Sequence, residues 1–161
     1  MSRRDIVPTG YYGIGIIHYK NAVNVGTLLR SCYAFGASFA FTIGRRYCRQ
    51  SSDTVNAWLY MPIYNYPTCE DFVRYIPFQC QVIGVEMGAA TDLGEFVHPN
   101  RAIYILGSED NGLPNGISYA DVVSIRSRVC LNVATAGSII MYDRAVKARL
   151  GVKHVQGKQT G

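Results

Sequence analysis

The sequence predicts an α/β domain in which a mainly parallel sheet is flanked by helices. Short apolar segments alternate with helical patterns along the chain, and these segments are hydrophobic at successive positions rather than at every second one. Strands with two apolar faces are typical of a buried parallel sheet. The 161 residues contain no repeat or low-complexity linker, so we expect a single domain over residues 1–161, with a loose polar tail at 156–161.

Local signals place the individual elements. The apolar run Tyr11–Tyr19 predicts a strand, and the next helix is expected to begin at Asn24, whose side chain can cap it, and to end at Gly36. A polar, basic loop is expected at 44–52. The other expected strands are 39–43, 81–86, 101–106 and 121–125, and the other expected helices are 54–60, 69–75 and 132–150.

The composition excludes several classes of protein. The longest segment without Asp, Glu, Lys or Arg is 54–69, which contains two prolines and is shorter than the roughly 20 residues of a membrane span. The N-terminus lacks the apolar stretch of a secretory signal. With no H-x-x-x-H, C-x-x-C or G-x-S-x-G pattern, we expect no metal site and no serine-type acyl transfer. The odd number of cysteines, five, predicts reduced thiols and a cytoplasmic location.

The charge balance is mildly basic. Sixteen Lys and Arg residues against eleven Asp and Glu residues give a net charge of +5 and a pI near 9.0. Most of the cations are arginines, whose guanidinium groups bind phosphate through two parallel hydrogen bonds. This balance is compatible with a nucleic-acid partner, although many metabolic enzymes are equally basic.

Three glycine-bearing turns, at 24–26, 84–88 and 107–112, adjoin the predicted strands. Ligands of parallel sheets bind beyond the carboxyl ends of the strands. Glycine there lets a ligand approach the backbone closely. The sequence therefore predicts a ligand site at that edge of the sheet.

Three segments of the chain share the pattern of one protein family. Residues 24–36 read NVGTLLRSCYAFG, residues 105–114 read ILGSEDNGLP, and residues 130–136 read CLNVATA. They resemble, in this order, the N-x-G-x-x-x-R helix opening, the G-x-E-x-x-G-L-P turn and the S-L-N-V-S-x-A helix start of the SpoU/TrmH family, in the SPOUT class of RNA methyltransferases. Each motif alone is weak, whereas the three together are specific.

The resemblance spans roughly Tyr11 to Leu150 and implies both a fold and an activity. The implied activity is transfer of a methyl group from S-adenosylmethionine (AdoMet) to a ribose 2′-hydroxyl of RNA. The implied structure has a trefoil knot in the C-terminal third and forms a homodimer whose subunits together complete the site. Without an added RNA-binding domain, the chain is most similar to the compact members that act on the wobble position of tRNA. Other tRNA positions and ribosomal RNA stay open.

The resemblance also implies a catalytic set of Arg30, Asn24 and Glu109. Arg30 would act on the 2′-hydroxyl directly or through a substrate phosphate. A protonated guanidinium has no acceptor, so anchoring a phosphate is an easier role for it than acting as a base. Glu109 can orient Arg30 through an ion pair. Taken singly, an arginine in a helix is usually a solvated charge, and Glu109 could be a helix-start acid.

The implied AdoMet contacts come from the strand ends and from the entry to the last helix. They are Gly84, Val85, Gly107, Ile125, Cys130 and Leu131. Two features depart from the family pattern. Ala134 stands where the family usually has Ser, and the segment 125–132 has Arg126 and Arg128 in place of a longer loop containing I-P-M.

Contacts with RNA are expected from Arg45, Arg46 and Arg49, with Tyr47 as a ring on which a base could stack. A second candidate phosphate-binding face consists of the C-terminal cations Arg144, Lys147, Arg149, Lys153 and Lys158. For both sets a solvated surface is the alternative.

Two other functions compete with methyl transfer. One is an RNA-binding protein that has the fold but no turnover, and the other is a small nucleotide-binding α/β enzyme. The second is disfavoured because no G-x-G-x-x-G opens a helix and no G-x-x-x-x-G-K-[ST] is present.

Overall fold

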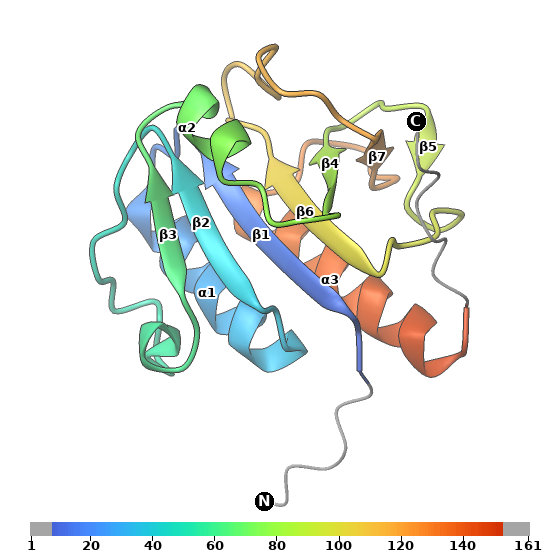
Figure 1. The fold of residues 1–161 in the computed structure, drawn as a ribbon, viewed down its shortest axis with the longest axis horizontal. Helices are drawn as coiled ribbons and strands as arrows, with labels where there is room; N and C mark the ends of the chain where they lie inside the picture. Colours follow the sequence, from blue (N-terminus) through green and yellow to red (C-terminus); the bar gives the residue numbers. More distant parts are fainter. Residues whose placement is uncertain (1–7, 153–161) are drawn as a thin grey trace, which may run out of the picture.

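Seven parallel strands form one sheet in the order β3-β2-β1-β6-β4-β7-β5 (Figure 1). The computed structural model describes residues 8–152, so the predicted tail at 156–161 lies outside the described residues. The strands are β1 (Tyr11–Ile17), β2 (Phe39–Ile43), β3 (Ile63–Tyr66), β4 (Gln81–Val85), β5 (Thr91–Asp92), β6 (Arg101–Leu106) and β7 (Asp121–Ser124). The predicted α/β class with a mainly parallel sheet is confirmed.

Helices cover the two faces of the sheet unequally. The helices are α1 (Ala22–Phe35), the 3₁₀ turn η1 (Ala57–Leu59), α2 (Cys69–Arg74) and α3 (Val133–Arg149). Figure 1 shows α1 and α3 together behind the sheet and the short α2 alone in front of it. Among the described residues, no helix is long and apolar enough to cross a membrane.

The core consists of two apolar clusters, one on each face of the sheet. Ile14 and Ile16 of β1 point toward α1 and α3, whereas Ile17 belongs to the cluster under α2. All three side chains are buried. The central strands are thus buried on both sides, which is why their sequences are apolar without alternation.

Glycines in β1 make room for aromatic rings of β2. A Cβ atom on Gly13 would lie 2.2 Å from the ring of Phe39, and one on Gly15 would lie 2.3 Å from the carbonyl oxygen of Phe41. Phe39 is therefore seated directly over the backbone of β1. This close approach fixes the aromatic side chains on the α2 face of the sheet.

The first helix begins earlier than predicted. Asn21, not Asn24, is the N-cap of α1, and its side-chain oxygen accepts a hydrogen bond of 3.0 Å from the backbone N–H of Val23. Asn21 has the extended backbone that a cap requires. Asn24 consequently lies in the first turn, with its side chain available for tertiary contacts. The predicted stop at Gly36 is confirmed by its left-handed φ of 74°.

The segment between β2 and α2 differs most from prediction. The helix expected at 54–60 is a single 3₁₀ turn, stabilised by a hydrogen bond from the backbone N–H of Ala57 to Asp53 Oδ1.

Two strands were not predicted. β3 is an edge strand in which Tyr64 and Asn65 break the apolar pattern, and β5 has only two residues. The remaining elements end within one or two residues of the predicted bounds. The trefoil knot stays a prediction.

Candidate active site

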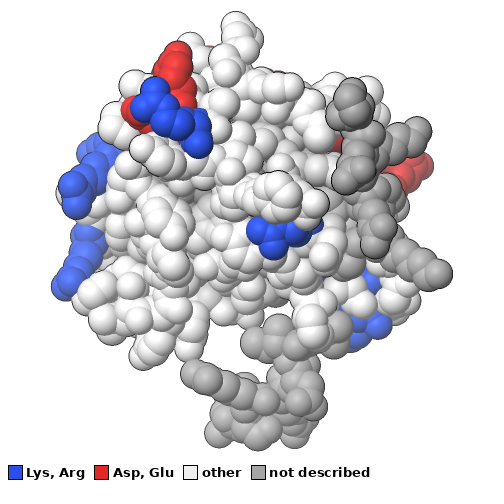
Figure 2. Space-filling model, viewed as in Figure 1, with Lys and Arg blue, Asp and Glu red and all other residues white. Residues whose placement is uncertain are grey.

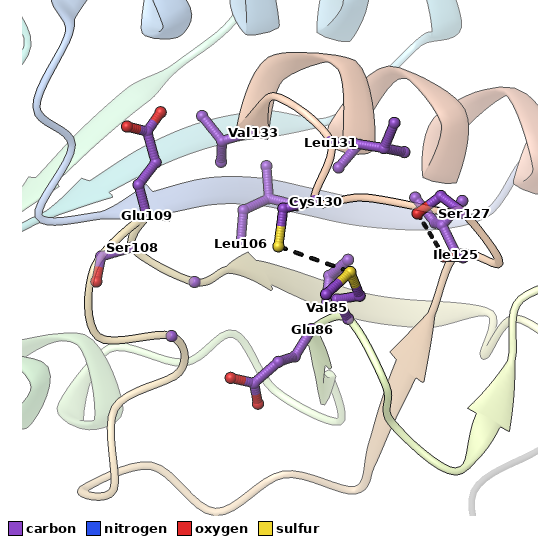
Figure 3. A pocket seen from close by; sticks show the side chains of 14 residues that line it. Val85, Glu86, Leu106, Ser108, Glu109, Ile125, Ser127, Cys130, Leu131 and Val133 are labelled. Atoms are coloured by element: carbon purple, nitrogen blue, oxygen red, sulfur yellow. Dashed lines mark hydrogen bonds between the residues drawn. The ribbon is translucent and has the colours of Figure 1, made fainter.

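A cavity of about 340 Å³ opens at the carboxyl edge of β6, β4 and β7, where the sequence predicts a ligand site. Figure 3 shows Glu109 and Val133 on one side of this space and Ile125 and Ser127 on the other. We call it the edge cavity. Its lining residues are Val85, Glu86, Met87, Leu106, Gly107, Ser108, Glu109, Gly112, Ile125, Ser127, Cys130, Leu131, Val133 and Ala136.

Most of the expected AdoMet contacts line the edge cavity. They are Val85, Gly107, Ile125, Cys130 and Leu131. Gly84 does not line it. A Cβ atom there would lie 2.4 Å from Leu113 Cδ1, so this glycine makes room for the turn after β6 to pack on β4. Glu86 and Met87 were missed, although their position directly after a buried strand is itself a signal for a ligand contact.

The turn after β6 gives the edge cavity its backbone wall. Ser108 and Gly112 exchange backbone hydrogen bonds of 3.0 Å in both directions, which closes the turn. A Cβ atom on Gly107 would lie 2.8 Å from the backbone of Gly112, so only glycine fits this crossing. The main chain is therefore presented to the cavity without a side chain in front of it.

The charged residues that line the edge cavity are acidic. Glu86 and Glu109 line it, and no Lys or Arg among residues 8–152 does. Leu106, Leu131 and Val133 supply apolar surface. A cavity with this lining favours an apolar, cationic ligand over a phosphate-bearing one. Within residues 8–152, no cluster of three or more His, Cys, Asp or Glu side chains is arranged to hold a metal ion.

Two asparagines and one glutamate, one residue from each sequence motif, form a hydrogen-bonded relay. Asn132 caps α3 by accepting hydrogen bonds from the backbone N–H groups of Ala134 and Thr135. Its Nδ2 donates to Asn24 Oδ1 at 3.0 Å, and Asn24 Nδ2 donates to Glu109 Oε1 at 3.3 Å. The relay thus connects the start of α3, the first turn of α1 and the rim of the edge cavity.

Arg30 lies apart from this relay. It is exposed on α1 and does not line the edge cavity. Within the described part of the chain it makes no ion pair, and the expected ion pair with Glu109 is not formed within one copy, where Asn24 donates to that carboxylate. A single copy of the chain therefore brings Asn24 and Glu109 together, and leaves Arg30 facing solvent.

Of the two departures from the family pattern, one lies away from the edge cavity and the other adjoins it. Ala134 is buried and does not line the edge cavity, so the missing hydroxyl does not face the ligand space. In the loop after β7, Arg126 pairs with Asp92 through an Nε–Oδ2 distance of 3.3 Å, and Arg128 is exposed. This loop nevertheless contributes Ile125 and Ser127 to the cavity lining.

The basic loop after β2, residues 44–52, exposes three arginines and is called here the arginine loop. Arg45 donates to the carbonyl of Lys20 at 2.9 Å, and the guanidinium of Arg49 lies 3.4 Å from the centre of the Trp58 ring. Arg46 is also exposed. Tyr47 is half-buried against the core, and its hydroxyl accepts a hydrogen bond from a backbone N–H. Stacking of a base on its ring stays a prediction.

The candidate C-terminal phosphate face is contradicted at Arg144 and Lys147. Arg144 is fully buried and donates to the carbonyls of Thr9, Pro99 and Asn100, while Lys147 donates to those of Leu93 and Phe96. Arg149 is exposed, and Lys153 and Lys158 lie outside the described residues. The C-terminal half of α3 therefore turns Arg144 and Lys147 inward and leaves Arg149 at the surface.

Arg144 and Lys147 belong to a buried network with His98, Tyr104 and Asp143. Arg144 donates to the Tyr104 hydroxyl at 2.8 Å, Tyr104 contacts His98 Nδ1 at 2.7 Å, and His98 Nε2 lies 2.8 Å from Asp143 Oδ2. Burial, together with the nearby Arg144 charge, lowers the pKa of His98. Burial raises the pKa of Asp143, but the hydrogen bonds from His98 and Lys147 outweigh it and lower that pKa. The network is satisfied by a neutral His98 and an ionised Asp143.

Fold and cavity together describe a parallel α/β domain that presents a ligand site assembled from three separate sequence motifs. The SpoU rRNA Methylase family matches residues 14–142 of this chain. The chain belongs to that family of RNA methyltransferases.

Similar proteins include one curated relative and several solved structures. The mouse protein named tRNA (guanosine(18)-2'-O)-methyltransferase TARBP1 is 30% identical over 145 residues, which cover 80% of this chain and 9% of the mouse protein. The SpoU methyltransferase AviRb from Streptomyces viridochromogenes, in complex with AdoMet, has a TM-score of 0.78 at 20% identity, covering 88% of this chain and 61% of that one. The chain thus spans less than two thirds of both proteins.

A third similar protein matches over nearly its whole length. It is a structure described by the 2-OH methylation of C/U34 on tRNA, with a TM-score of 0.75 at 17% identity. The match covers 89% of this chain and 99% of that one. At 17% identity, this similarity shows that the two chains share a fold.

Proposed function

We propose that this protein transfers a methyl group from AdoMet to a ribose 2′-hydroxyl of RNA, with tRNA as the substrate. The observation that carries the proposal is the edge cavity, whose apolar walls and two carboxylates suit a ligand with a flat apolar body and a positive charge. AdoMet has both features. The names of the mouse relative and of the tRNA C/U34 structure support tRNA.

The residues of the edge cavity would hold AdoMet in two ways. Leu106, Leu131 and Val133 would pack on the adenosyl group, and the bare backbone at Gly107 would offer hydrogen bonds to it. Glu109 would face the sulfonium side, kept in place by the relay from Asn24 and Asn132. When bound, AdoMet supplies the electrophilic methyl group. The protein then has to hold the ribose oxygen in line with that group.

We propose a homodimer in which Arg30 of a second copy faces the edge cavity. This follows from the separation of Arg30 from the cavity within one chain and from its exposure on α1. A guanidinium there would anchor a phosphate of the substrate and polarise the neighbouring 2′-hydroxyl. As the ribose oxygen takes the methyl group and S-adenosylhomocysteine leaves, the hydroxyl proton would pass to solvent water. The guanidinium would assist electrostatically and would not have to be neutral.

The test incubates the purified protein with methyl-labelled AdoMet and bulk tRNA. We expect label in tRNA at ribose 2′-oxygens, located by digestion to nuclease-resistant dinucleotides. We also expect AdoMet at about 100 times its Kd to stabilise the protein by ~2.7 kcal/mol. RNA binding without transfer would instead indicate a non-catalytic RNA-binding protein, and absence of stabilisation by AdoMet would indicate another kind of α/β enzyme.

The arginine loop is the proposed RNA contact outside the catalytic centre. Replacing Arg45 and Arg46 together by Ala should weaken tRNA binding and lower the slope of log Kd against log salt by about 1–2, because fewer counterions are released. Binding measured from 50 to 300 mM salt gives the slope. Arg149→Ala, at an exposed position at the end of α3, is the control for a general loss of charge, and an equal effect there would remove the arginine loop from the interface.

A further inference from the structure

A groove lined by tyrosines lies on the face of the sheet that α1 and α3 do not cover. Its volume is about 520 Å³. It is formed by the start of β1, the edge strand β3 and the chain that leaves α2, and Figure 1 shows that α2 covers only one end of these strands. We call it the tyrosine groove. Its ring-bearing lining residues are Tyr11, Tyr64, Tyr66, Tyr75, Pro67 and Pro77.

The groove gathers tyrosines whose hydroxyls have no partner within the described residues. Of the twelve tyrosines in the chain, Tyr12, Tyr19, Tyr47, Tyr104 and Tyr119 use their hydroxyls in hydrogen bonds. The four tyrosines of the groove make no such bond. A tyrosine hydroxyl that is partly buried usually finds a partner. These four phenols are therefore available to a ligand.

The rings of the groove are held in place from below by the aromatic residues of β2. Phe39, seated over Gly13, lies 5.7 Å from the ring centre of Tyr11 and 5.7 Å from that of Tyr64. Tyr64 in turn lies 6.3 Å from Tyr66. Side chains fixed in this way lose little freedom when a ligand binds, which favours recognition by stacking.

Positive charge near the groove comes from its margins. The guanidinium of Arg101 lies 4.5 Å from the ring centre of Tyr11, and Arg74 is exposed on α2. Figure 2 shows that the face carrying the groove is largely uncharged and that most of its visible Lys and Arg side chains lie toward the rim. Aromatic rings bordered by cations form the kind of surface that binds single-stranded nucleic acid.

The groove adjoins the arginine loop through β3. The backbone N–H of Gly44 donates to the carbonyl of Tyr66 at 2.8 Å, and that of Tyr47 donates to Asn65 Oδ1 at 2.8 Å. A strand of RNA bound to the exposed arginines can therefore pass over the sheet edge to the tyrosines without leaving the protein surface.

We infer that the tyrosine groove binds an unpaired nucleobase of the RNA substrate. The base stacks on the exposed rings of Tyr64 and Tyr75, and the phenol hydroxyls bond its edge. Asp71, on the groove wall, accepts a hydrogen bond from an exocyclic amino group. The inference rests on the proposed function, because it assigns a second contact to the same RNA. Paired bases are excluded because their faces are already stacked.

The test removes the two exposed rings together, as Tyr64→Ala/Tyr75→Ala. Their side chains are 47% and 61% exposed, so the fold should survive their loss. Tyr60→Ala is the matched control, because Tyr60 is 61% exposed, has no hydroxyl partner within the described residues and lies outside the groove. The probes are a fluorescent single-stranded octanucleotide of mixed sequence and unmodified tRNA.

We expect the double variant to bind the octanucleotide at least about fivefold more weakly and to raise KM for tRNA at unchanged kcat, with Tyr60→Ala like the parent. Photocrosslinking of 5-iodouridine RNA should label the peptide that contains Tyr64 or Tyr75. Unchanged octanucleotide affinity in the double variant would overturn the inference. The inference would also be overturned if a proline-rich peptide bound the groove while the double variant bound RNA like the parent.

These readouts separate the groove from the methyl transfer. If no RNA is methylated but the double variant still weakens octanucleotide binding, the proposed function fails and the groove assignment stands. If tRNA is methylated and the double variant binds and turns over like Tyr60→Ala, the proposed function stands and the groove assignment fails.

Discussion

The buried network and the edge cavity both use polar side chains of β6 and α3 or their adjoining loops, but they use them in opposite ways. In the network, Arg144 is fully buried and each of its donors meets a carbonyl or the Tyr104 hydroxyl. At the cavity, Glu86 and Glu109 are exposed, and no cation from the described part of the chain lines the space.

The difference shows how a structural polar cluster can be told from a functional one. A cluster whose hydrogen bonds are all satisfied within the chain has nothing left to offer a ligand, and its contribution is to stability. Exposed carboxylates at a cavity are solvated and stay available to a cationic ligand. Substitutions in the two regions should therefore affect different measurements.

The largest expected effect is on stability, in the network. Arg144→Met keeps the apolar stem but leaves three carbonyls and the Tyr104 hydroxyl without their donor. We expect the free energy of unfolding to fall by about 3–5 kcal/mol. Urea denaturation measures this. Arg149→Met, at an exposed position of the same helix, should change it by less than about 0.5 kcal/mol. A similar effect of both substitutions would show that the network is not the anchor of α3.

The next effect is on activity, through Arg30. Arg30→Ala should lower kcat by about 100-fold or more, equivalent to ~2.7 kcal/mol, while the unfolding free energy and AdoMet affinity stay near the parent values. Single-turnover transfer to tRNA is the measurement. Mixing Arg30→Ala with the cavity variant Gly107→Val should restore about a quarter of the activity if each site uses two subunits. Parent-like turnover in Arg30→Ala would refute its role.

A smaller effect is expected from pH, through His98. Its lowered pKa means that the unfolded chain takes up a proton near pH 6.5 while the folded chain does not. Stability from this group is therefore largely present above about pH 6.5 and is lost as the pH falls from 6.5 toward the folded-state pKa. The pKa of Asp143 is also lowered. The stability that this carboxylate contributes is lost only when the pH falls below its ordinary pKa of 3.8.

Chemical unfolding at pH 7.5, 6.5 and 5.5 tests this assignment. His98→Gln should flatten the dependence, whereas the same substitution at the exposed His18 should leave it as it is. A parent-like pH slope in His98→Gln would assign the acid sensitivity to other groups.

The smallest expected effect is on AdoMet affinity, from the loss of one charge at the edge cavity. Glu109→Gln keeps an oxygen for Asn24 but removes the negative charge, so AdoMet should bind about two- to fivefold more weakly. The uncharged product S-adenosylhomocysteine should bind as before. Asp110→Asn is the control, because Asp110 pairs with Lys20 and does not line the cavity. Equal weakening of both ligands by Glu109→Gln would mean that packing, not charge, holds them.

Local patterns were enough to predict the central strands and both long helices. The strand 39–43 and the strand 101–106 have the predicted bounds because their apolar residues are continuous and have clear stops. The cap of α1 was misplaced because Asn21 and Asn24 are both suitable residue types. β3 was missed because an edge strand need not be apolar on both faces.

The sequence by itself determined the fold class and the ligand edge of the sheet, because these depend on hydrophobic runs and on glycines next to them in the chain. Five of the six AdoMet contacts that the family resemblance implied also line the cavity. Only the tertiary structure decided which charged side chains are free to act. Arg144 and Arg30 are both arginines within predicted helices. Arg144 is nevertheless enclosed by carbonyls from distant segments, whereas Arg30 faces solvent. Burial of a charge depends on residues far away in sequence, so no local pattern reports it.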